Sequence, residues 1–65
     1  MDELDVQIIL CLADSNMNVS RTAEAMFMHR NTVVYHINKV KKITGLDPVN
    51  FYDLVKLVQM VTKDK

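Results

Sequence analysis

The sequence contains one cysteine, one glycine, one proline and no tryptophan among its 65 residues. A single cysteine, Cys11, provides no disulfide framework, and in an apolar run it is typical of a small buried side chain in a reducing, cytoplasmic setting. The few Gly and Pro residues leave few turn signals, which favours helices over a many-turned β fold. No apolar run reaches the roughly 18–20 residues that cross a membrane, and the acidic N-terminus does not resemble a signal peptide.

Charge is unevenly distributed although the formal net charge is zero. Residues 1–16 contain four acids and no base, whereas residues 17–44 contain five bases and one acid. The central segment therefore carries about +4, and a polyanion responds to that local field rather than to the neutral total. A solvated basic face without a partner is the alternative that charge alone leaves open.

An apolar segment with a capping residue predicts a first helix from about Glu3 to Asp14. Asp2 is a suitable N-cap, and Asp5, three residues further on, can return the bond in a capping box. After the first turn nearly every side chain is apolar, so we expect this helix to be the central buried element. Acids in a first turn interact favourably with the helix dipole, which is a sufficient reason for them here.

Two more helices are predicted in the centre of the chain. The second runs from about Arg21 to Phe27, with Ser20 as its N-cap. The third is capped by His29 or a neighbour and ends at Gly45, a suitable C-terminal residue for a helix. Apolar residues at i, i+4 and i+7 form the inward stripe of the third helix: Val33, Ile37 and Val40.

A fourth helix follows the connecting turn LDPVN. Asn50 is its expected N-cap, and Asp53 completes a capping-box-like pair. Its apolar stripe consists of Leu54, Leu57, Val58 and Val61. The predicted fold class is therefore all-α, with four helices, short connections and no strand, in one domain over residues 1–65.

The second and third helices have the pattern of a helix-turn-helix. A short helix, a turn of about three residues and a longer helix with a polar outer face define this arrangement. Its second helix enters a DNA major groove about 12 Å wide, and we expect residues 30–43 to form this recognition helix. At 100° per residue, the face opposite the apolar stripe has Arg30, Asn31, Val34, Tyr35 and Asn38, with His36 and Lys39 toward its flanks.

The residue types on this face suit DNA recognition. Arg30 can form a bidentate contact with guanine, and Asn31 can do the same with adenine. Thr32 in the first turn suits a phosphate contact, together with free backbone N–H groups at the positive end of the helix dipole. Val34 is apolar where solvent is expected, and a thymine methyl group would be a suitable partner.

Further contacts are expected at the flanks of this face. Ser20 and Arg21 begin the second helix, which in such domains crosses the phosphate backbone. His29 more simply caps or packs at the helix start, and His36 provides a partial charge near phosphates. The predicted DNA-binding residues are Ser20, Arg21, His29, Arg30, Asn31, Thr32, Val34, Tyr35, His36 and Lys39.

The segment NVSRTAEAMFMHRNTVVYHINKVKKITGLD resembles the C-terminal DNA-binding domain of PucR-type and CdaR-type bacterial transcriptional regulators, which govern purine catabolism and sugar-diacid use. The family pattern has an N-V-S-x-T-A opening, then H-R-N-T, an aromatic residue, an isoleucine and T-G. The matching residues here are Asn18, Val19, Ser20, Thr22, Ala23, His29, Arg30, Asn31, Thr32, Tyr35, Ile37, Thr44 and Gly45. The RNT corner is also similar to the more distant Fis-type helix-turn-helix.

The resemblance implies a helix-turn-helix without a wing that binds double-stranded DNA and controls transcription in the cytoplasm. It also implies that the chain is a fragment of a larger regulator, whose sensory region lies N-terminal to it. On this basis we expect no cofactor, no membrane contact and no small-molecule ligand in the domain itself.

Two departures from the family pattern matter. Many helix-turn-helix units have Gly in the turn, where this chain has Phe27. Because a positive φ is costly for Phe, we expect an altered turn or a longer second helix, with Phe27 packed inward. The family commonly has Arg where Val34 and His36 stand here, so the reading face carries fewer fixed charges.

Simpler interpretations of the remaining polar residues stay open. His29 and His36 are seven residues apart, and no carboxylate or cysteine stands at ligand spacing beside them, so no metal site is expected. Tyr35 can be a plain surface residue. Of the lysine cluster, only Lys39 and Lys42 point outward on the same side as Tyr35, and the cluster can simply be a soluble C-terminal turn.

Sequence-specific DNA binding is the function that these observations favour. The alternative is a helical dimerisation or partner-docking module, because Phe51, Val55 and Met60 are apolar outside the main stripe of the fourth helix. The two are compatible, since operator-binding proteins often pair across a two-fold axis, here through helix four or helix one. An enzyme is not expected, because the sequence has no Gly-rich phosphate loop, no nucleophile–His–acid set and no metal-ligand spacing.

Overall fold

The computed structural model describes residues 1–63, which form four helices and no strand. The helices are α1 (Glu3–Asp14), α2 (Val19–Ala25), α3 (Arg30–Thr44) and α4 (Phe51–Thr62). The predicted all-α fold with short connections is confirmed. Over this range, none of the helices combines the length and the hydropathy that a membrane span requires.

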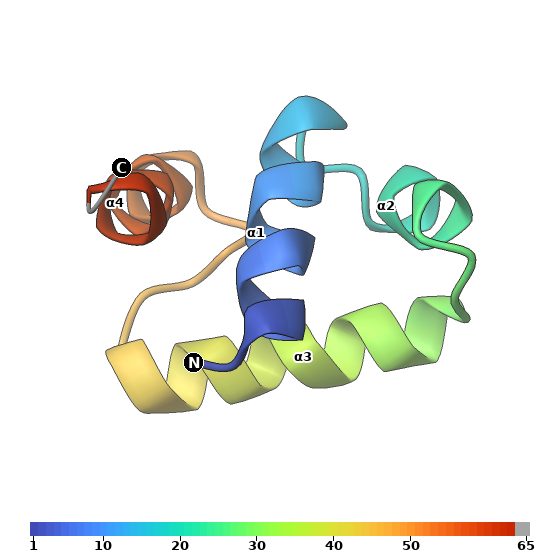
Figure 1. Ribbon diagram of the computed structural model, residues 1–65, viewed down its shortest axis with the longest axis horizontal. Coiled ribbons are helices and arrows are strands. Elements are labelled where there is room, and N and C mark those ends of the chain that lie inside the picture. Colours follow the sequence, from blue (N-terminus) through green and yellow to red (C-terminus); the bar gives the residue numbers. More distant parts are fainter. Residues whose placement is uncertain (64–65) are drawn as a thin grey trace.

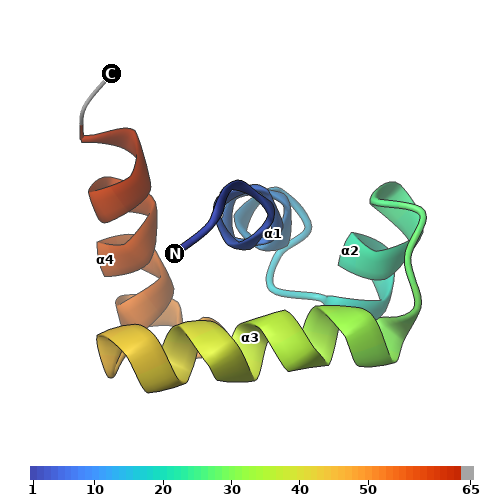
Figure 2. The ribbon, with the colours of Figure 1, turned by 60° about the horizontal axis from the view of Figure 1, so that its bottom comes forward.

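Helix α1 is the centre of the arrangement. It contacts each of the other three helices, with α2 and α4 on opposite sides and α3 crossing underneath (Figures 1 and 2). Helix α2 lies beside the N-terminal end of α3, and α4 starts near its C-terminal end. The two ends of α3 therefore have different neighbours, and the helix-turn-helix corner, where α2 meets the N-terminal end of α3, lies at one end of the molecule.

The hydrophobic core joins all four helices around α1. The predicted stripe of α3 is confirmed, because Val33, Ile37 and Val40 are all buried. The buried cluster to which they belong also contains Ile8, Ile9 and Leu12 of α1, Ala23 of α2, and Leu54 and Leu57 of α4. The expectation that α1 is the central buried helix is confirmed, and α3 is held to it by a continuous apolar contact.

Helix α2 begins two residues earlier than the sequence pattern suggested. Its N-cap is Asn18, whose side-chain oxygen accepts a hydrogen bond of 2.9 Å from the backbone N–H of Arg21. The predicted cap, Ser20, is an exposed residue inside the first turn, so that prediction was wrong. Asn is at least as good an N-cap as Ser, and it stands at the right spacing.

Helix α4 begins where predicted, at Asn50, which accepts a hydrogen bond of 3.2 Å from the backbone N–H of Asp53. The capping-box role of Asp53 was wrong. Its carboxylate accepts from the backbone N–H of Asp47 at 3.0 Å and so closes the α3–α4 connection. The backbone N–H of Asn50 donates instead to the carbonyl of Asp47.

Phe27 was expected to avoid a positive φ and to pack inward, and both expectations were wrong. Its φ is 55° and its side chain is 95% exposed. The backbone explains the conformation, because the N–H of Met28 donates to the carbonyl of Ala23, and the N–H of Phe27 donates to that of Glu24. This pair of bonds is a Schellman motif, in which the residue after the helix takes the left-handed conformation.

Candidate nucleic-acid interface

The outer face of α3 displays most of the side chains predicted to read DNA. Arg30, Asn31 and Asn38 are exposed, and Tyr35 keeps 64% of its surface exposed. Thr32 and Val34 are half-buried, so Val34 is less available than the helical spacing suggested. The first turn of α3 therefore exposes a guanidinium and an amide to solvent.

The N-terminus of α3 has no side-chain cap. His29 occupies the N-cap position, as predicted, but its side chain forms no capping hydrogen bond, and the first turn contains no acid. The other three helices are capped by Asp2, Asn18 and Asn50. The first backbone N–H groups of α3, at the positive end of its dipole, are therefore left without a side-chain acceptor.

The start of α2 contributes a second cationic position. Ser20 and Arg21 are exposed in its first turn. Within residues 1–63, the ion pairs involve His36, Lys39 and Lys41 but neither Arg21 nor Arg30. The two arginine charges are thus not neutralised by this part of the chain, which suits contacts with an external anion.

Two open hollows flank the outer face of α3. One, of about 240 Å³, is lined by Tyr35, Asn38, Lys39 and Lys42, so the structure does bring together the residues predicted to share that side. The other, of about 450 Å³, lies at the helix-turn-helix corner and is lined by Ala23, Glu24, Phe27, Met28, His29 and Thr32. His29 and Thr32 therefore lie together beside the exposed Phe27 ring.

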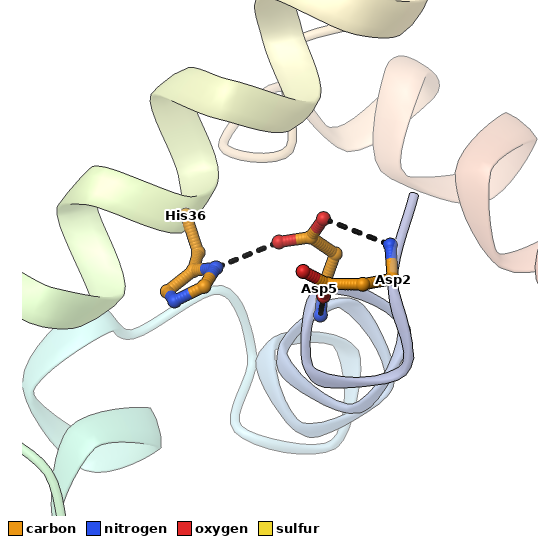
Figure 3. A group of neighbouring side chains, drawn as sticks. All are labelled: Asp2, Asp5 and His36. Carbon is orange, nitrogen blue, oxygen red and sulfur yellow. Dashed lines mark hydrogen bonds and ion pairs between the residues drawn. The ribbon is translucent and has the colours of Figure 1, made fainter.

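His36 was predicted toward the flank of the DNA-facing side, as a partial charge near phosphates, but the structure buries it. The residue is only 9% exposed and lies between α3 and α1. Its ring Nδ1 lies 2.7 Å from Oδ1 of Asp5, a carboxylate with no exposed surface (Figure 3). Because a carboxylate oxygen accepts hydrogen bonds, Nδ1 is the protonated ring nitrogen in this pair.

Lys39 belongs to the same network and is less free than predicted. Its ammonium lies 2.8 Å from Oδ2 of Asp2 and 3.1 Å from Oδ2 of Asp5, with its side chain about one-third exposed. Asp2 and Asp5 also form the predicted capping box, through reciprocal backbone bonds of 2.9 and 3.2 Å. The four side chains of Asp2, Asp5, His36 and Lys39 are called the α1–α3 polar network below.

The titration of the network follows from these contacts. The ammonium of Lys39, and then the backbone N–H of Asp5, lower the pKa of Asp2 from 3.8 to about 2. Burial alone would raise the pKa of Asp5, but hydrogen bonds from His36 and Lys39 lower it on balance. The same carboxylates, Asp2 foremost, raise the pKa of Lys39. Both acids are therefore ionised at neutral pH.

Sequence reasoning missed this network because its members are far apart in the chain. In the sequence no carboxylate stands at ligand spacing from His36, but the fold brings two beside it: the carboxylates of Asp2 and Asp5 and the His36 ring place ligand-type atoms within 4.8 Å of one another. In this arrangement Lys39 supplies the cation, and the donors and acceptors satisfy each other. The available signal was Asp5, an acid three residues before Ile8 on the inward face of an apolar helix.

The fold and this surface define a helix-turn-helix domain with an open recognition-helix N-terminus. Residues 6–60 match the PucR C-terminal helix-turn-helix domain, and the chain belongs to this family. It is 38% identical to the carbohydrate diacid regulator of Escherichia coli K12 over 50 residues, which are 77% of this chain and 13% of that protein.

A second relative is an uncharacterized protein of Haemophilus influenzae, 50% identical over 32 residues, or 49% of this chain and 9% of that protein. The chain thus spans a small part of the length of both relatives. No solved structure matches the chain. Membership of the family connects this helix-turn-helix with transcription regulation.

Proposed function

We propose that this domain is the non-enzymatic output domain of a cytoplasmic bacterial transcription regulator, and that it binds double-stranded DNA sequence-specifically. The observation that carries the proposal is the N-terminus of α3, which has no side-chain cap and no first-turn acid and lies next to the exposed Arg30 and Asn31. Helix N-termini of this kind bind phosphate, and the adjacent side chains read bases.

Each residue of the surface has a proposed role. Arg30 contacts a guanine edge, and Asn31 contacts an adenine edge in the major groove. Thr32 and the free N–H groups at the start of α3 bind a phosphate, with His29 beside them. Ser20 and Arg21 contact the phosphate backbone that α2 crosses.

Tyr35, Val34 and Asn38 continue the surface along α3 toward the hollow that Lys39 and Lys42 line. Because Val34 is half-buried, only part of its side chain is available to contact a thymine methyl group. The aliphatic part of Lys39 lies at the rim of the DNA-facing side while its ammonium is held by Asp2 and Asp5. His36 lies behind this face, so we assign it to the α1–α3 polar network rather than to phosphate binding.

Salt dependence tests the proposal. Fluorescence anisotropy with a labelled mixed-sequence duplex should give a log–log plot of affinity against salt with a slope of about −0.9 per neutralised phosphate, for about three to five contacts per domain. Selection of bound duplexes from a random pool, with the full-length regulator, should then yield the operator. Absence of binding at low salt, or an affinity that does not change with salt, would overturn the proposal.

We also propose that two copies of the domain bind adjacent half-sites. One helix-turn-helix unit buries only about 600–1,000 Å² on DNA, which limits specificity, and two recognition helices about 34 Å apart read inverted half-sites one turn apart. Helix α4 is favoured over α1 as the contact, because α1 is covered by three helices whereas α4 exposes apolar side chains. These are Phe51, Tyr52, Val55 and Met60. A footprint limited to one half-site, with the full-length regulator, would contradict pairing.

A docking module that does not read DNA is the second candidate, and the exposed apolar residues of α4 favour it. Sedimentation and anisotropy separate the two functions. Concentration-dependent association without any shift of labelled duplex would support the docking module. A duplex shift that weakens with salt supports DNA binding.

A further inference from the structure

Two different kinds of contact hold α3 against α1. The first is the apolar stripe, in which Val33, Ile37 and Val40 pack on α1. Hydrophobic contact attracts the helices but has little directionality. The second is the α1–α3 polar network, which crosses the same interface and is composed of hydrogen bonds and ion pairs with restricted geometry.

The carboxylate of Asp5 is the centre of the network. Its Oδ1 accepts from the ring Nδ1 of His36 at 2.7 Å. Its Oδ2 accepts from the backbone N–H of Asp2 at 3.2 Å and lies 3.1 Å from the ammonium of Lys39. In residues 1–63 no buried side-chain polar atom lacks a partner, so Asp5 is satisfied although it has no exposed surface.

The α1–α3 polar network contacts α3 through two side chains on one face of the helix. His36 and Lys39 are three residues apart, which places their side chains next to each other on a helix, and both reach the same Asp5 carboxylate. Rotating α3 by one residue turns this face by about 100° and breaks both contacts. The same rotation would carry Arg30 and Asn31 off the DNA-facing side.

We infer that Asp5 is a positioning residue for DNA reading, which fixes the rotation and register of the recognition helix through His36 and Lys39. The inference rests on the proposed function. A binding constellation must be held by supporting residues to be productive, and buried polar pairs select one arrangement among similarly packed ones. Asp5 itself touches no DNA, because it lies between the helices.

Replacing Asp5 distinguishes a positioning role from a purely electrostatic one, because the two predict opposite changes in the affinity for the operator. Asp5→Asn removes a negative charge and one of the two carboxylates paired with Lys39, so electrostatics alone would tighten binding to any duplex. Positioning predicts weaker binding to the selected operator, with mixed-sequence binding unchanged or tighter. The specificity ratio, operator over mixed duplex, should fall about tenfold, the equivalent of one lost base contact.

Glu3→Gln is the matched control. Glu3 is an exposed residue in the same first turn of α1 and is not part of the α1–α3 polar network. Its substitution by Gln removes the same negative charge as Asp5→Asn. Both variants are made in the full-length regulator, and operator and mixed duplex are titrated at one salt concentration. Glu3→Gln should keep the specificity ratio of the unchanged protein. A folded Asp5→Asn variant with an unchanged ratio would overturn the inference.

A second variant keeps the test decisive if Asp5→Asn fails to fold. Asp2 is exposed, and Asp2→Asn preserves an N-cap while removing the 2.8 Å ion pair with Lys39. Its specificity ratio should fall by a smaller factor, about two- to threefold, since the contacts of His36 and Lys39 with Asp5 both remain. Residual dipolar couplings on each folded variant should show a changed orientation of α3 relative to α1, which includes the rotation of α3 about its own axis and is called the α1–α3 angle here; loss of stability alone would not produce this change.

The outcomes are distinguishable. If the unchanged regulator selects no operator, the proposed function fails. If it selects one, and the folded variants keep both the specificity ratio and the α1–α3 angle, only the positioning inference fails. A reduced ratio with a changed angle in Asp5→Asn or Asp2→Asn, and neither change in Glu3→Gln, supports it.

Discussion

The N-termini of α1 and α3 are built in opposite ways. Helix α1 begins at Asp2, whose carboxylate accepts from the backbone N–H of Asp5 at 2.9 Å while Asp5 returns the bond at 3.2 Å. Helix α3 begins at His29, which forms no side-chain cap and is followed by the exposed Arg30 and Asn31. The N-terminus of α1, capped by Asp2 and Asp5, is called the closed start. The N-terminus of α3, which has no side-chain cap and is followed by the cationic Arg30, is called the open start.

The two helix N-termini differ in whether groups inside the domain satisfy their first-turn polar groups. An N-cap contributes about 1 kcal/mol, so a helix that lacks one gives up stability unless an external group replaces it. The acids of α1 find their partners inside the domain, in His36 and Lys39 of α3. The first turn of α3 has no such internal acceptor, and we interpret it as the place where a phosphate and base edges complete the structure.

Removing Arg30 should have the largest effect. Arg30→Ala should weaken operator binding by about 1–3 kcal/mol and relax preference at one base pair if the side chain reads guanine. Its melting temperature should stay nearly unchanged, because Arg30 is exposed and forms no ion pair within the described residues. Anisotropy on the operator and on single-base variants measures both effects.

A uniform loss across all sequences, with a salt slope smaller by about one, would instead assign Arg30 to a phosphate. Loss of folding, or unchanged binding, would contradict the DNA-facing position of this residue. Lys63→Ala, at the C-cap of α4, is the control, since it also removes an exposed cation but lies outside the proposed DNA interface and beyond the α4 residues proposed for pairing.

Removing the side-chain N-cap of α4 should lower the stability of the fold but leave DNA binding unchanged. Asn50→Ala deletes the cap of α4 and should cost about 1 kcal/mol, which lowers the melting temperature by about 4–8 °C in a domain of this size. Thermal unfolding followed by circular dichroism measures the shift. Operator binding well below the melting temperature should be unchanged. An unaltered melting temperature would mean that the 3.2 Å bond to Asp53 contributes nothing.

Adding a side-chain N-cap to α3 should raise the stability of the domain and lower its affinity for DNA. His29→Asp introduces an acceptor for the first-turn N–H groups of α3 and an acid at the positive end of its dipole, which should stabilise the domain by about 0.5–1 kcal/mol. The same acid would repel a phosphate, so DNA affinity should fall. His29→Gln, which adds no charge, is the comparison. Higher stability together with unchanged affinity would show that no phosphate binds at this end.

The acids of the closed start should give a stability change confined to low pH. The pKa of Asp2 is about 2 in the folded protein and 3.8 as its ordinary value, and that of Asp5 is lowered as well. An acid whose pKa is lower in the folded than in the unfolded protein stabilises the fold when the pH is above its ordinary pKa. This stabilisation is lost as the pH falls from about 5 toward 2. Melting temperatures of the unchanged chain should therefore decline over this window more than those of Asp2→Asn. Superimposable profiles would contradict the ion pair with Lys39.

Local patterns predicted most of the fold. The α1 capping box, the α3 stripe and the Asn50 cap all depend on residues within a few positions of one another, and the structure confirms them. The α2 start was misplaced because both Asn18 and Ser20 are good caps, and only hydrogen-bond geometry distinguishes them. Phe27 escaped prediction because the Schellman bonds outweigh the cost of its positive φ.

The α1–α3 polar network was beyond local reasoning. Asp5 and His36 are 31 residues apart, and helical periodicity placed His36 on the flank of the outer face. Its true position depends on how α3 crosses α1, which is a property of the whole packing. The exposure of Asn31 and Tyr35 was predictable, because each is two residues from the buried Val33 and therefore lies on the opposite side of α3.

The most direct test is to map which amides respond to DNA. In heteronuclear NMR spectra of the chain titrated with a duplex that contains a single operator half-site, where two copies do not pair through α4, shifts should concentrate at residues 18–21 and 29–35, around the open start of α3 and the start of α2. The closed start of α1 and the exposed face of α4 should shift less. Shifts concentrated at α4 or at residues 2–7, with none in the first turn of α3, would contradict the account.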